Sequence, residues 1–357
     1  MTRPRLDPRT PLCELHVHLG AAVTPAIMWG IAHAQGIRLP TKDYWAFREL
    51  ITVGRRRRGF DAYLDLFHWT ELIQSSPIAV ERSVYEVIGG AYRKNNVTQL
   101  ELRFNPMKRN RGGEQDLDHI IAAAVRGMDR AVLEYPQVRA GLIFCLDRGF
   151  SRALNEIIAA KAIAWQSRGV VGIDIAGPVV EDFRLADYSE LFAACRRAGL
   201  GLTVHAGETG GADEVREALE ALEPDRIGHG VHSADDRSVL AMLRERGTVL
   251  EVCPSSNLNT GVLRNIADVR RVVRTLADGG VRFTVSTDGP EMLRSYLRDE
   301  LNLLMRHDIL SLEEVERAIR TGVEASFLDR APAVPSSVGG LEGGANGHAP
   351  IPVEVRS

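Results

Sequence analysis

Two histidines, His16 and His18, stand at the end of the short apolar stretch LCELHVHLG at residues 12–20. The stretch predicts a buried strand, and side chains at positions i and i+2 of a strand point to the same side, so both imidazoles can face one metal ion. A single pair of this kind does not establish a metal site, because histidines also lie in protein cores with their nitrogens satisfied. Further candidate ligands strengthen the hypothesis, because His205 and Asp288 each follow another apolar, strand-like run.

These four residues supply three imidazoles and one carboxylate. Zinc sites that perform hydrolysis combine three or four nitrogen and oxygen ligands with one position for water, whose pKa falls to about 7 on the ion. With Zn²⁺ and hydroxide such a set is close to neutral, which suits a partly buried pocket. The residue types therefore indicate metal-assisted hydrolysis.

Two more residues beside this metal could transfer a proton or position the attacking oxygen. Glu208 lies three residues after His205 in HAGE, where the chain is expected to turn from strand to helix. It can shuttle protons if burial raises its pKa, although a glutamate in the first turn of a helix can also simply interact with the helix dipole. His229 ends the expected sixth strand, within the motif RIGHGVH, and could align a hydroxide for attack, whereas His232 lies nearer the loop and is expected to be structural.

The elements that would position these residues alternate between strand-like and helix-like segments, which implies a parallel sheet covered by helices. Eight such units without a Gly-rich dinucleotide fingerprint favour a (β/α)8 barrel, a TIM-type fold, over a doubly wound sheet. Functional residues of such barrels lie at the carboxyl ends of the strands. The strand-like runs cover residues 12–19, 97–106, 139–148, 170–178, 200–208, 225–232, 248–257 and 281–290.

The insertion at residues 20–96 is far longer than an ordinary connection and predicts a helical lid. Its amphipathic segment 59–73 places Phe60, Tyr63 and Phe67 near one stripe, where they either pack the lid onto the barrel or line an apolar substrate pocket. The preceding run Arg55–Arg58 is either a solvated loop or a contact for an anionic group. We expect one domain over residues 1–330 and a disordered tail over residues 331–357.

The composition of the chain limits the kinds of molecule that the protein is expected to bind. The 357 residues are 45% hydrophobic and 25% charged, enough to bury a large core. The net charge of −3 gives no basic field for nucleic acid or a membrane surface, so a small-molecule substrate is expected. Four isolated cysteines indicate a reduced core, and the N-terminus has no apolar leader, so the expected location is cytoplasmic. The oligomeric state stays open.

Six motifs, ELHVHL, GVVGIDIAGP, TVHAGE, RIGHGVH, EVCPSSN and STDGP, resemble in order and spacing those of the adenosine deaminase family of the amidohydrolase superfamily, from about residue 12 to 330. The resemblance implies a barrel that binds one zinc ion. It further implies that Glu208 protonates the ring nitrogen beside the reacting carbon, that His229 orients the hydroxide, and that the backbone of Gly177 contacts the purine. The implied zinc ligands are His16, His18, His205 and Asp288.

Two departures from the family pattern concern the substrate. Gly20 stands where the family has an acidic residue that binds the ribose 5′-hydroxyl, and Gly289 replaces the second of two aspartates, which binds the purine N7 edge. Losing a buried hydrogen bond costs about 1 to 3 kcal/mol. Gly20 is expected to open room for a 5′ substituent, so we hypothesise a 5′-extended 6-aminopurine nucleoside, such as aminodeoxyfutalosine. Alternatively, Gly289 selects a heterocycle that lacks the N7 acceptor.

Two rival functions remain. A zinc barrel amidohydrolase could cleave a non-purine amide, ester or lactone, and ammonia release separates it from a deaminase. A catalytically silent member could act by binding alone, but the complete ligand set with Glu208 and His229 argues against that. The other class of zinc deaminases, with a P-C-x-x-C signature, does not fit, since the CPSS at residues 253–256 lacks the second cysteine.

Overall fold

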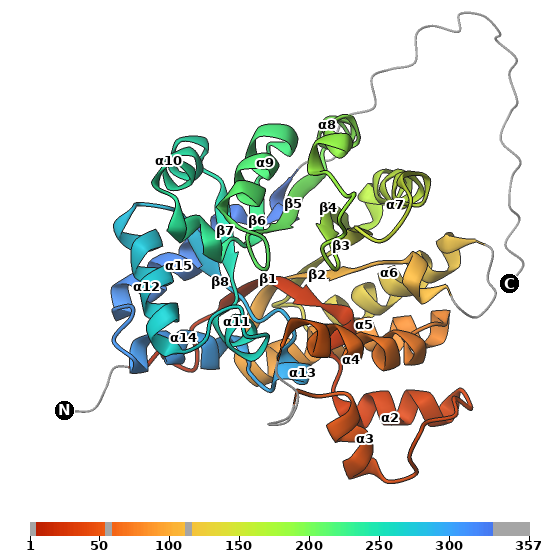
Figure 1. Ribbon diagram of the computed structural model, residues 1–357. Helices are drawn as coiled ribbons and strands as arrows, with labels where there is room; N and C mark the ends of the chain where they lie inside the picture. Colours follow the sequence, from red (N-terminus) through yellow and green to blue (C-terminus); the bar gives the residue numbers. More distant parts are fainter. Residues whose placement is uncertain (1–4, 54–58, 111–115, 331–357) are drawn as a thin grey trace, which may run out of the picture.

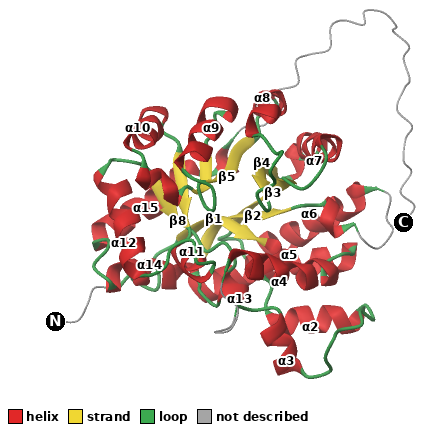
Figure 2. Ribbon diagram, in the orientation of Figure 1, coloured by secondary structure: helices red, strands yellow, loops and turns green. Residues whose placement is uncertain are grey.

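The computed structural model describes residues 5–53, 59–110 and 116–330. Eight parallel strands follow one another around a single sheet in the order β1 to β8, and helices surround them (Figure 2). This architecture confirms the predicted (β/α)8 barrel. The strands are β1 Leu12–His18, β2 Val97–Phe104, β3 Arg139–Asp147, β4 Val170–Ala176, β5 Gly201–Ala206, β6 Arg226–His229, β7 Val249–Val252 and β8 Phe283–Val285.

The last strands are shorter than the runs predicted from sequence, because the polar residues that follow them turn into the site. The barrel closes between the first strand and the segment after β8, through a parallel bridge between Val17 and Asp288. The His18 amide donates to the Asp288 carbonyl at 2.9 Å, and the Asp288 amide donates to the His16 carbonyl at 2.8 Å. Candidate ligands therefore form the closing backbone contacts.

Strand β1 contains an irregularity that separates Glu14 from the histidines. Glu14 pairs with Leu100 and Val17 pairs with Leu102, so two residues of β1, Leu15 and His16, lie opposite one residue of β2. This bulge turns Glu14 and Val17 to the same outer side of the sheet, whereas His16 lies among the interior side chains.

The interior below the strand ends is polar. Arg103 contacts both Asp174 and Glu251 at 2.8 Å, and Arg226 contacts Glu251 at 2.7 Å and Glu101 at 2.5 Å. All five side chains are fully buried. Buried charges are tolerated only when they are paired and hydrogen-bonded, and this network meets that condition.

The apolar core lies between the strands and an outer ring of helices. One ring helix follows each strand, and several begin at a side-chain cap, such as Ser76 before α5 and the capping box of Ser311 and Glu314 before α15. The ring helices are α5 Pro77–Asn95, α6 Leu117–Glu134, α7 Arg152–Ala164, α8 Ser189–Arg197, α9 Ala212–Leu222, α10 Arg237–Arg246, α12 Ile266–Asp278 and α15 Leu312–Ala325.

Shorter helices complete the described chain. After β7 and β8 come α11 Pro254–Asn259, α13 Pro290–Leu293 and α14 Leu297–Arg306. The 3₁₀ helices are η1 Met107–Arg109, η2 Gln166–Arg168, η3 Leu185–Tyr188, η4 Val231–Asp235 and η5 Phe327–Asp329.

The insertion after β1 is helical, as predicted, but its last helix belongs to the ring. Helix α5 packs against α6 and β2, so the inserted part consists of α1 Leu19–Ala22, α2 Pro25–Ala34, α3 Tyr44–Leu50 and α4 Phe60–Ile73. Helices α2 and α3 stand outside the ring, while α4 lies close to the barrel (Figure 1). The predicted roles of Arg55–Arg58 and of the tail at 331–357 concern residues outside the described ones.

None of the helices in the described part of the chain is long and apolar enough to cross a membrane. All four cysteines are buried and unpaired, in agreement with the expected reduced core.

Candidate metal centre and active site

Four candidate ligand atoms meet at the carboxyl ends of β1, β5 and β8. Nε2 of His18 lies 3.2 Å from Nε2 of His205, and Oδ1 of Asp288 lies 3.5 Å from His18 Nε2 and 3.9 Å from His16 Nε2. Atoms bound to a tetrahedral zinc ion at about 2.0–2.1 Å lie roughly 3.3 Å apart. The observed spacing is close to that value, so the four side chains fit one zinc ion.

The hydrogen bonds behind the histidines leave the correct nitrogens for a metal. Nδ1 of His16 lies 2.7 Å from the Glu251 carboxylate, and Nδ1 of His205 lies 3.0 Å from the Asp174 carboxylate. A carboxylate there keeps the imidazole proton on Nδ1 and the lone pair on Nε2. Nε2 of His16 is buried and has no hydrogen-bond partner among the described residues, as expected of an atom that a metal satisfies.

Burial also sets the charge of the ligands. Desolvation lowers the pKa of His16 and His18 well below the usual value, and the neighbouring cations and imidazoles act in the same direction. Both rings are therefore neutral at pH 7, the form that binds a metal. Burial raises the pKa of Asp288, whose Oδ2 accepts a hydrogen bond of 2.5 Å from Ser256 Oγ.

A second group of possible donors, His16, His229 and Cys253, overlaps with the first. Burial raises the pKa of the Cys253 thiol well above its usual value, and its Sγ donates to the Glu251 carbonyl at 3.5 Å. Only the thiolate is a good zinc ligand, so the group with His18, His205 and Asp288 is favoured.

Glu208 follows the turn at Gly207, whose φ is +65°, and its side chain points into the site. Its Oε2 lies 3.6 Å from His229 Nε2. Burial raises the pKa of Glu208 well above the usual value, and the charge of Asp288 raises it further. The helix-dipole alternative fails, because α9 begins at Ala212 and other acidic residues occupy its first turn.

His229 ends β6 with a φ of +60°, a conformation that is unusual for a residue with a side chain. Asn257 Nδ2 donates to its Nδ1 at 3.1 Å, which leaves the proton of the neutral ring on Nε2, on the side of Glu208. His232 instead lies in η4 and contacts Asp235 at 2.8 Å, which agrees with a structural role.

The pocket above the metal centre is bounded by helix α4 and the strand ends. Phe60 and Phe67 of α4 line it together with Gly177, and the Phe67 ring lies 6.3 Å from the His18 ring. Gly177 follows β4 with a φ of +97°, and a Cβ atom there would lie 3.1 Å from the Asp147 carboxylate. Its backbone can therefore approach a ligand closely.

Gly20 and Gly289 both lie against α4, where the expectation for Gly20 is wrong. A Cβ atom at Gly20 would lie 2.9 Å from the Phe67 ring and 3.1 Å from Nη2 of Arg109, so these side chains fill the space that was expected to be open. A Cβ atom at Gly289 would lie 2.6 Å from the hydroxyl of Tyr63. Each glycine is required by a side chain packed against it.

Open space lies beside Gly20 instead. A cavity of about 350 Å³ continues from His18 and Gly177 toward Lys108 and Arg109. Nδ2 of Asn105 in its wall is buried without a hydrogen-bond partner among the described residues.

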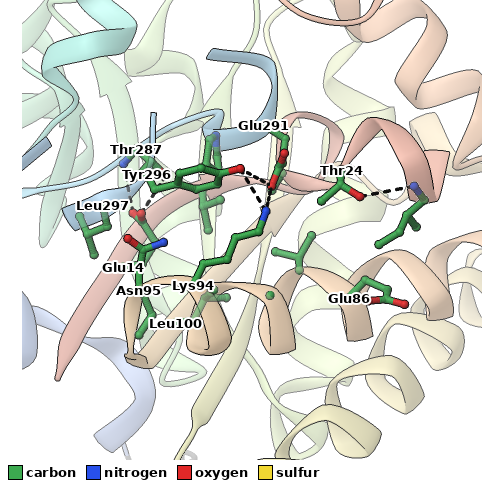
Figure 3. Close-up of a pocket in the computed structure, with 18 residues that line it drawn as sticks. Glu14, Thr24, Glu86, Lys94, Asn95, Leu100, Thr287, Glu291, Tyr296 and Leu297 are labelled. Atoms are coloured by element: carbon green, nitrogen blue, oxygen red, sulfur yellow. Dashed lines mark hydrogen bonds and ion pairs between the residues drawn. The ribbon is translucent and has the colours of Figure 1, made fainter. Parts of the chain in front are cut away.

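Another pocket lies on the outer side of β1 (Figure 3). Its volume is about 50 Å³, and none of the four candidate ligands lines it. Glu14 lines it and accepts hydrogen bonds from Thr287 Oγ1 at 2.7 Å and from the His16 amide at 3.2 Å. Glu14 therefore braces the two segments that carry the ligands, from behind the metal centre.

Roles for Glu251, Asp174 and Asn257 were not predicted from the sequence. Asp174 lies near the end of the strand-like run 170–178 and Asn257 ends the run 248–257, so the strand-end rule marks both as candidates. Glu251 lies inside a short apolar run, VLEV, where a lone buried carboxylate signals a partner. No sequence pattern places Tyr63 beside Gly289.

Comparison with known proteins identifies relatives of the whole barrel. A family model described as adenosine deaminase matches residues 11–333. The chain is similar to an adenosine deaminase of Clostridium kluyveri, with 28% identity over 320 residues that cover 90% of each chain.

Solved structures show the same fold. An adenine deaminase from Arthrobacter aurescens superposes with a TM-score of 0.79 at 22% identity, covering 89% of this chain and 94% of that one. An amidohydrolase from Burkholderia ambifaria with bound zinc gives a TM-score of 0.76 at 24% identity, covering 90% and 87%. An Arabidopsis N6-mAMP deaminase gives 0.77 at 23% identity, covering 90% and 94%.

Proposed function

Because the chain belongs to the adenosine deaminase family of metal-dependent aminohydrolases, we propose that it is a zinc-dependent hydrolytic deaminase of a 6-aminopurine nucleoside or a related aminated heterocycle. The observation that carries the proposal is the donor set of His16, His18, His205 and Asp288, with Glu208 and His229 beside it. We further propose one zinc ion per chain, held by these four ligands.

Bound zinc would lower the pKa of a water molecule in the site to about 7, so that attack is possible at neutral pH. Glu208 holds the proton that the ring nitrogen beside the reacting carbon receives. His229, fixed by Asn257, and Asp288 align the attacking oxygen. The oxygen bonds to the amino-bearing carbon, the carbon–nitrogen bond breaks, and the amino group leaves as ammonia with one proton from the attacking water. The other water proton restores Glu208, whose own proton stays on the ring nitrogen.

The ring would lie between Phe67 and Gly177 in the pocket above the metal centre. The cavity beside Gly20 supports a substrate with an extension at the 5′ position, because it continues from this pocket and has cationic side chains in its wall. Lys108 lies 2.5 Å from Asp147, so an anionic group would compete with that carboxylate for the ammonium. A 5′-phosphate and the 5′ substituent of aminodeoxyfutalosine are two concrete candidates, and the similar Arabidopsis protein is an N6-mAMP deaminase.

Ammonia release by the zinc-loaded protein tests the proposal. The panel contains adenine, adenosine, AMP, 5′-thio adenosine derivatives and aminodeoxyfutalosine. We expect one member to be deaminated, and Glu208→Gln should lower that rate by about 10²- to 10⁴-fold, because the variant cannot deliver a proton.

Zinc content, measured in parallel, should be the same for the wild type and Glu208→Gln, since Glu208 is not among the proposed ligands. Stoichiometric zinc without ammonia from any aminopurine would refute the deaminase and leave a hydrolase of another amide, ester or lactone. Equal rates for adenosine and all 5′-extended members would refute the 5′-extended substrate alone.

A further inference from the structure

The hydroxyl of Tyr63 is a polar group in the pocket with no function assigned so far. Tyr63 lies on α4, is only 5% exposed, and lines the pocket with Glu208, His229 and Asp288. Its Oη atom is buried and forms no hydrogen bond of normal geometry with any described residue. A buried hydroxyl without a partner costs free energy, so such a group inside a ligand pocket indicates a partner in the ligand.

The chain is built to keep this hydroxyl in place. A Cβ atom at Gly289 would lie 2.6 Å from Tyr63 Oη and 2.8 Å from the Ala21 Cβ atom. The φ of Gly289 is −137°, which any residue can adopt, so backbone conformation does not require glycine there. The position lacks a side chain because the hydroxyl of Tyr63 occupies its space.

The hydroxyl keeps its proton in this environment. A tyrosine phenol has an ordinary pKa of about 10, so it is protonated at neutral pH. A protonated phenol is a hydrogen-bond donor, and it suits a neutral acceptor atom on the ligand.

The arrangement of the strands determines which edge of the ring this donor faces. Glu208 follows β5, whereas Asp288 and Gly289 follow β8, three strands further around the barrel. In a 6-aminopurine the reacting carbon has N1 on one side and the N7 acceptor on the other side. If Glu208 contacts N1, the edge that carries N7 points toward Tyr63.

We propose that the Tyr63 hydroxyl donates a hydrogen bond to the ring nitrogen acceptor on the side of the reacting carbon opposite Glu208, the N7 position of a 6-aminopurine. The inference rests on the proposed function and adds a specificity-determining residue to it. It also means that Gly289 does not select a heterocycle without N7, because a donor from another element faces that edge.

The competing role for Tyr63 is structural support of Asp288, whose carboxylate interacts with the Tyr63 hydroxyl. Such support would stabilise the ligand set for every substrate, whereas a hydrogen bond to N7 helps only substrates that present that acceptor. The two roles therefore differ in their dependence on the ring atom.

The test compares Tyr63→Phe with the wild type on two substrates, the 6-aminopurine nucleoside turned over in the panel and its 7-deaza analogue, which has a C–H group in place of N7. We expect the variant to lose roughly 5- to 100-fold in kcat/KM on the purine and less than about 2-fold on the analogue. Tyr188→Phe is the matched control, because Tyr188 is equally buried, its hydroxyl accepts from Asn155 at 2.9 Å, and it does not line the pocket.

Binding supplies a readout that does not depend on turnover. Titration calorimetry of the deaminated product and of its 7-deaza form should show the same selective loss in Tyr63→Phe. Equal losses on both rings, or a fall in zinc affinity, would overturn the proposal in favour of structural support. If the wild type neither turns over nor binds any aminopurine, the proposed function fails, and the inference fails with it. That result differs from equal losses on both rings, so the two failures can be told apart.

Discussion

At the residue scale, the carboxylates of Glu251 and Asp174 decide which nitrogens of His16 and His205 are available. Each accepts from Nδ1, and each is itself held by Arg103 at 2.8 Å. The metal centre therefore extends into the buried ion network of the barrel interior, and its affinity depends on residues that never touch the ion.

Asp174→Asn tests this dependence. The amide can donate to Nδ1 of His205 and favour the wrong tautomer, so we expect zinc affinity to fall about 10- to 100-fold. Competition with a chromophoric chelator measures the change. Asp329→Asn, in an exposed ion pair with Arg139, should leave the affinity unaltered, and an unaltered affinity in Asp174→Asn would show that the pair does not orient the ring.

His16, His18 and Glu208 could be predicted from the sequence because local spacing is enough to place them. His16 and His18 are i and i+2 on one strand, and Glu208 lies three residues after His205. The sequence pattern placed Tyr63 on the aromatic stripe of the insertion but not against Gly289, because that contact joins α4 to the segment after β8 and depends on tertiary packing. Gly20 was misread for the same reason, since Phe67 and Arg109 reach it from other elements.

At the element scale, short segments after the strands aim the side chains. His229 and Asp288 both have φ values near +60°, which turns the chain sharply at the ends of β6 and β8. Helix α11 follows β7 directly and presents Ser256 to Asp288 and Asn257 to His229. Periodicity located the eight strands but overestimated the length of the last ones, because the polar residues after them turn the chain toward the site and do not continue the strand.

Helix α14 supports α11 through Glu300, which accepts from the Ser255 amide at 2.9 Å and from Ser295 Oγ. Burial raises the pKa of Glu300 from 4.5 to about 7. Between these two pH values the native protein holds a proton that the unfolded chain has released, so the free energy of unfolding falls as the pH rises.

Glu300→Gln removes this proton linkage. Between pH 4.5 and pH 8 the variant should therefore lose less stability than the wild type, by about 3 kcal/mol. Urea unfolding across the pH range measures the difference. Burial also raises the pKa of Glu14 to about 7. The wild type and Glu300→Gln therefore both keep the part of the pH dependence of stability that comes from Glu14. The exposed Glu313→Gln serves as control, and parallel curves for Glu300→Gln and wild type would contradict the expectation.

At the scale of the whole molecule, the fold was predictable because eight apolar runs alternate with amphipathic segments over one chain. The division of the long insertion was not, since only packing against α6 and β2 shows that α5 belongs to the ring. The proposed ligand set gathers residues from the first strand and from the segment after the last one, so we expect metal binding to be linked to global stability.

Zinc should therefore raise the melting temperature of the chelator-treated protein. A ligand at 100 times its Kd stabilises the native state by about 2.7 kcal/mol, which corresponds to a rise of several degrees. Differential scanning calorimetry measures it. Glu208→Gln should keep the rise and His205→Ala should lose it, whereas a rise of the same size in His205→Ala would place zinc elsewhere.

The bridge between Val17 and Asp288 has a consequence for the chain as a polymer. The two segments it joins are separated by almost the whole described sequence, and bringing such distant points together is costly in loop-closure entropy. A zinc ion shared by His16, His18 and Asp288 would tie the same two points, as a disulfide ties the ends of a loop in a secreted protein. Amide hydrogen exchange at His18 and Asp288, whose N–H groups form the closing hydrogen bonds, would then slow when zinc binds. The catalytic ion would also hold the barrel closed.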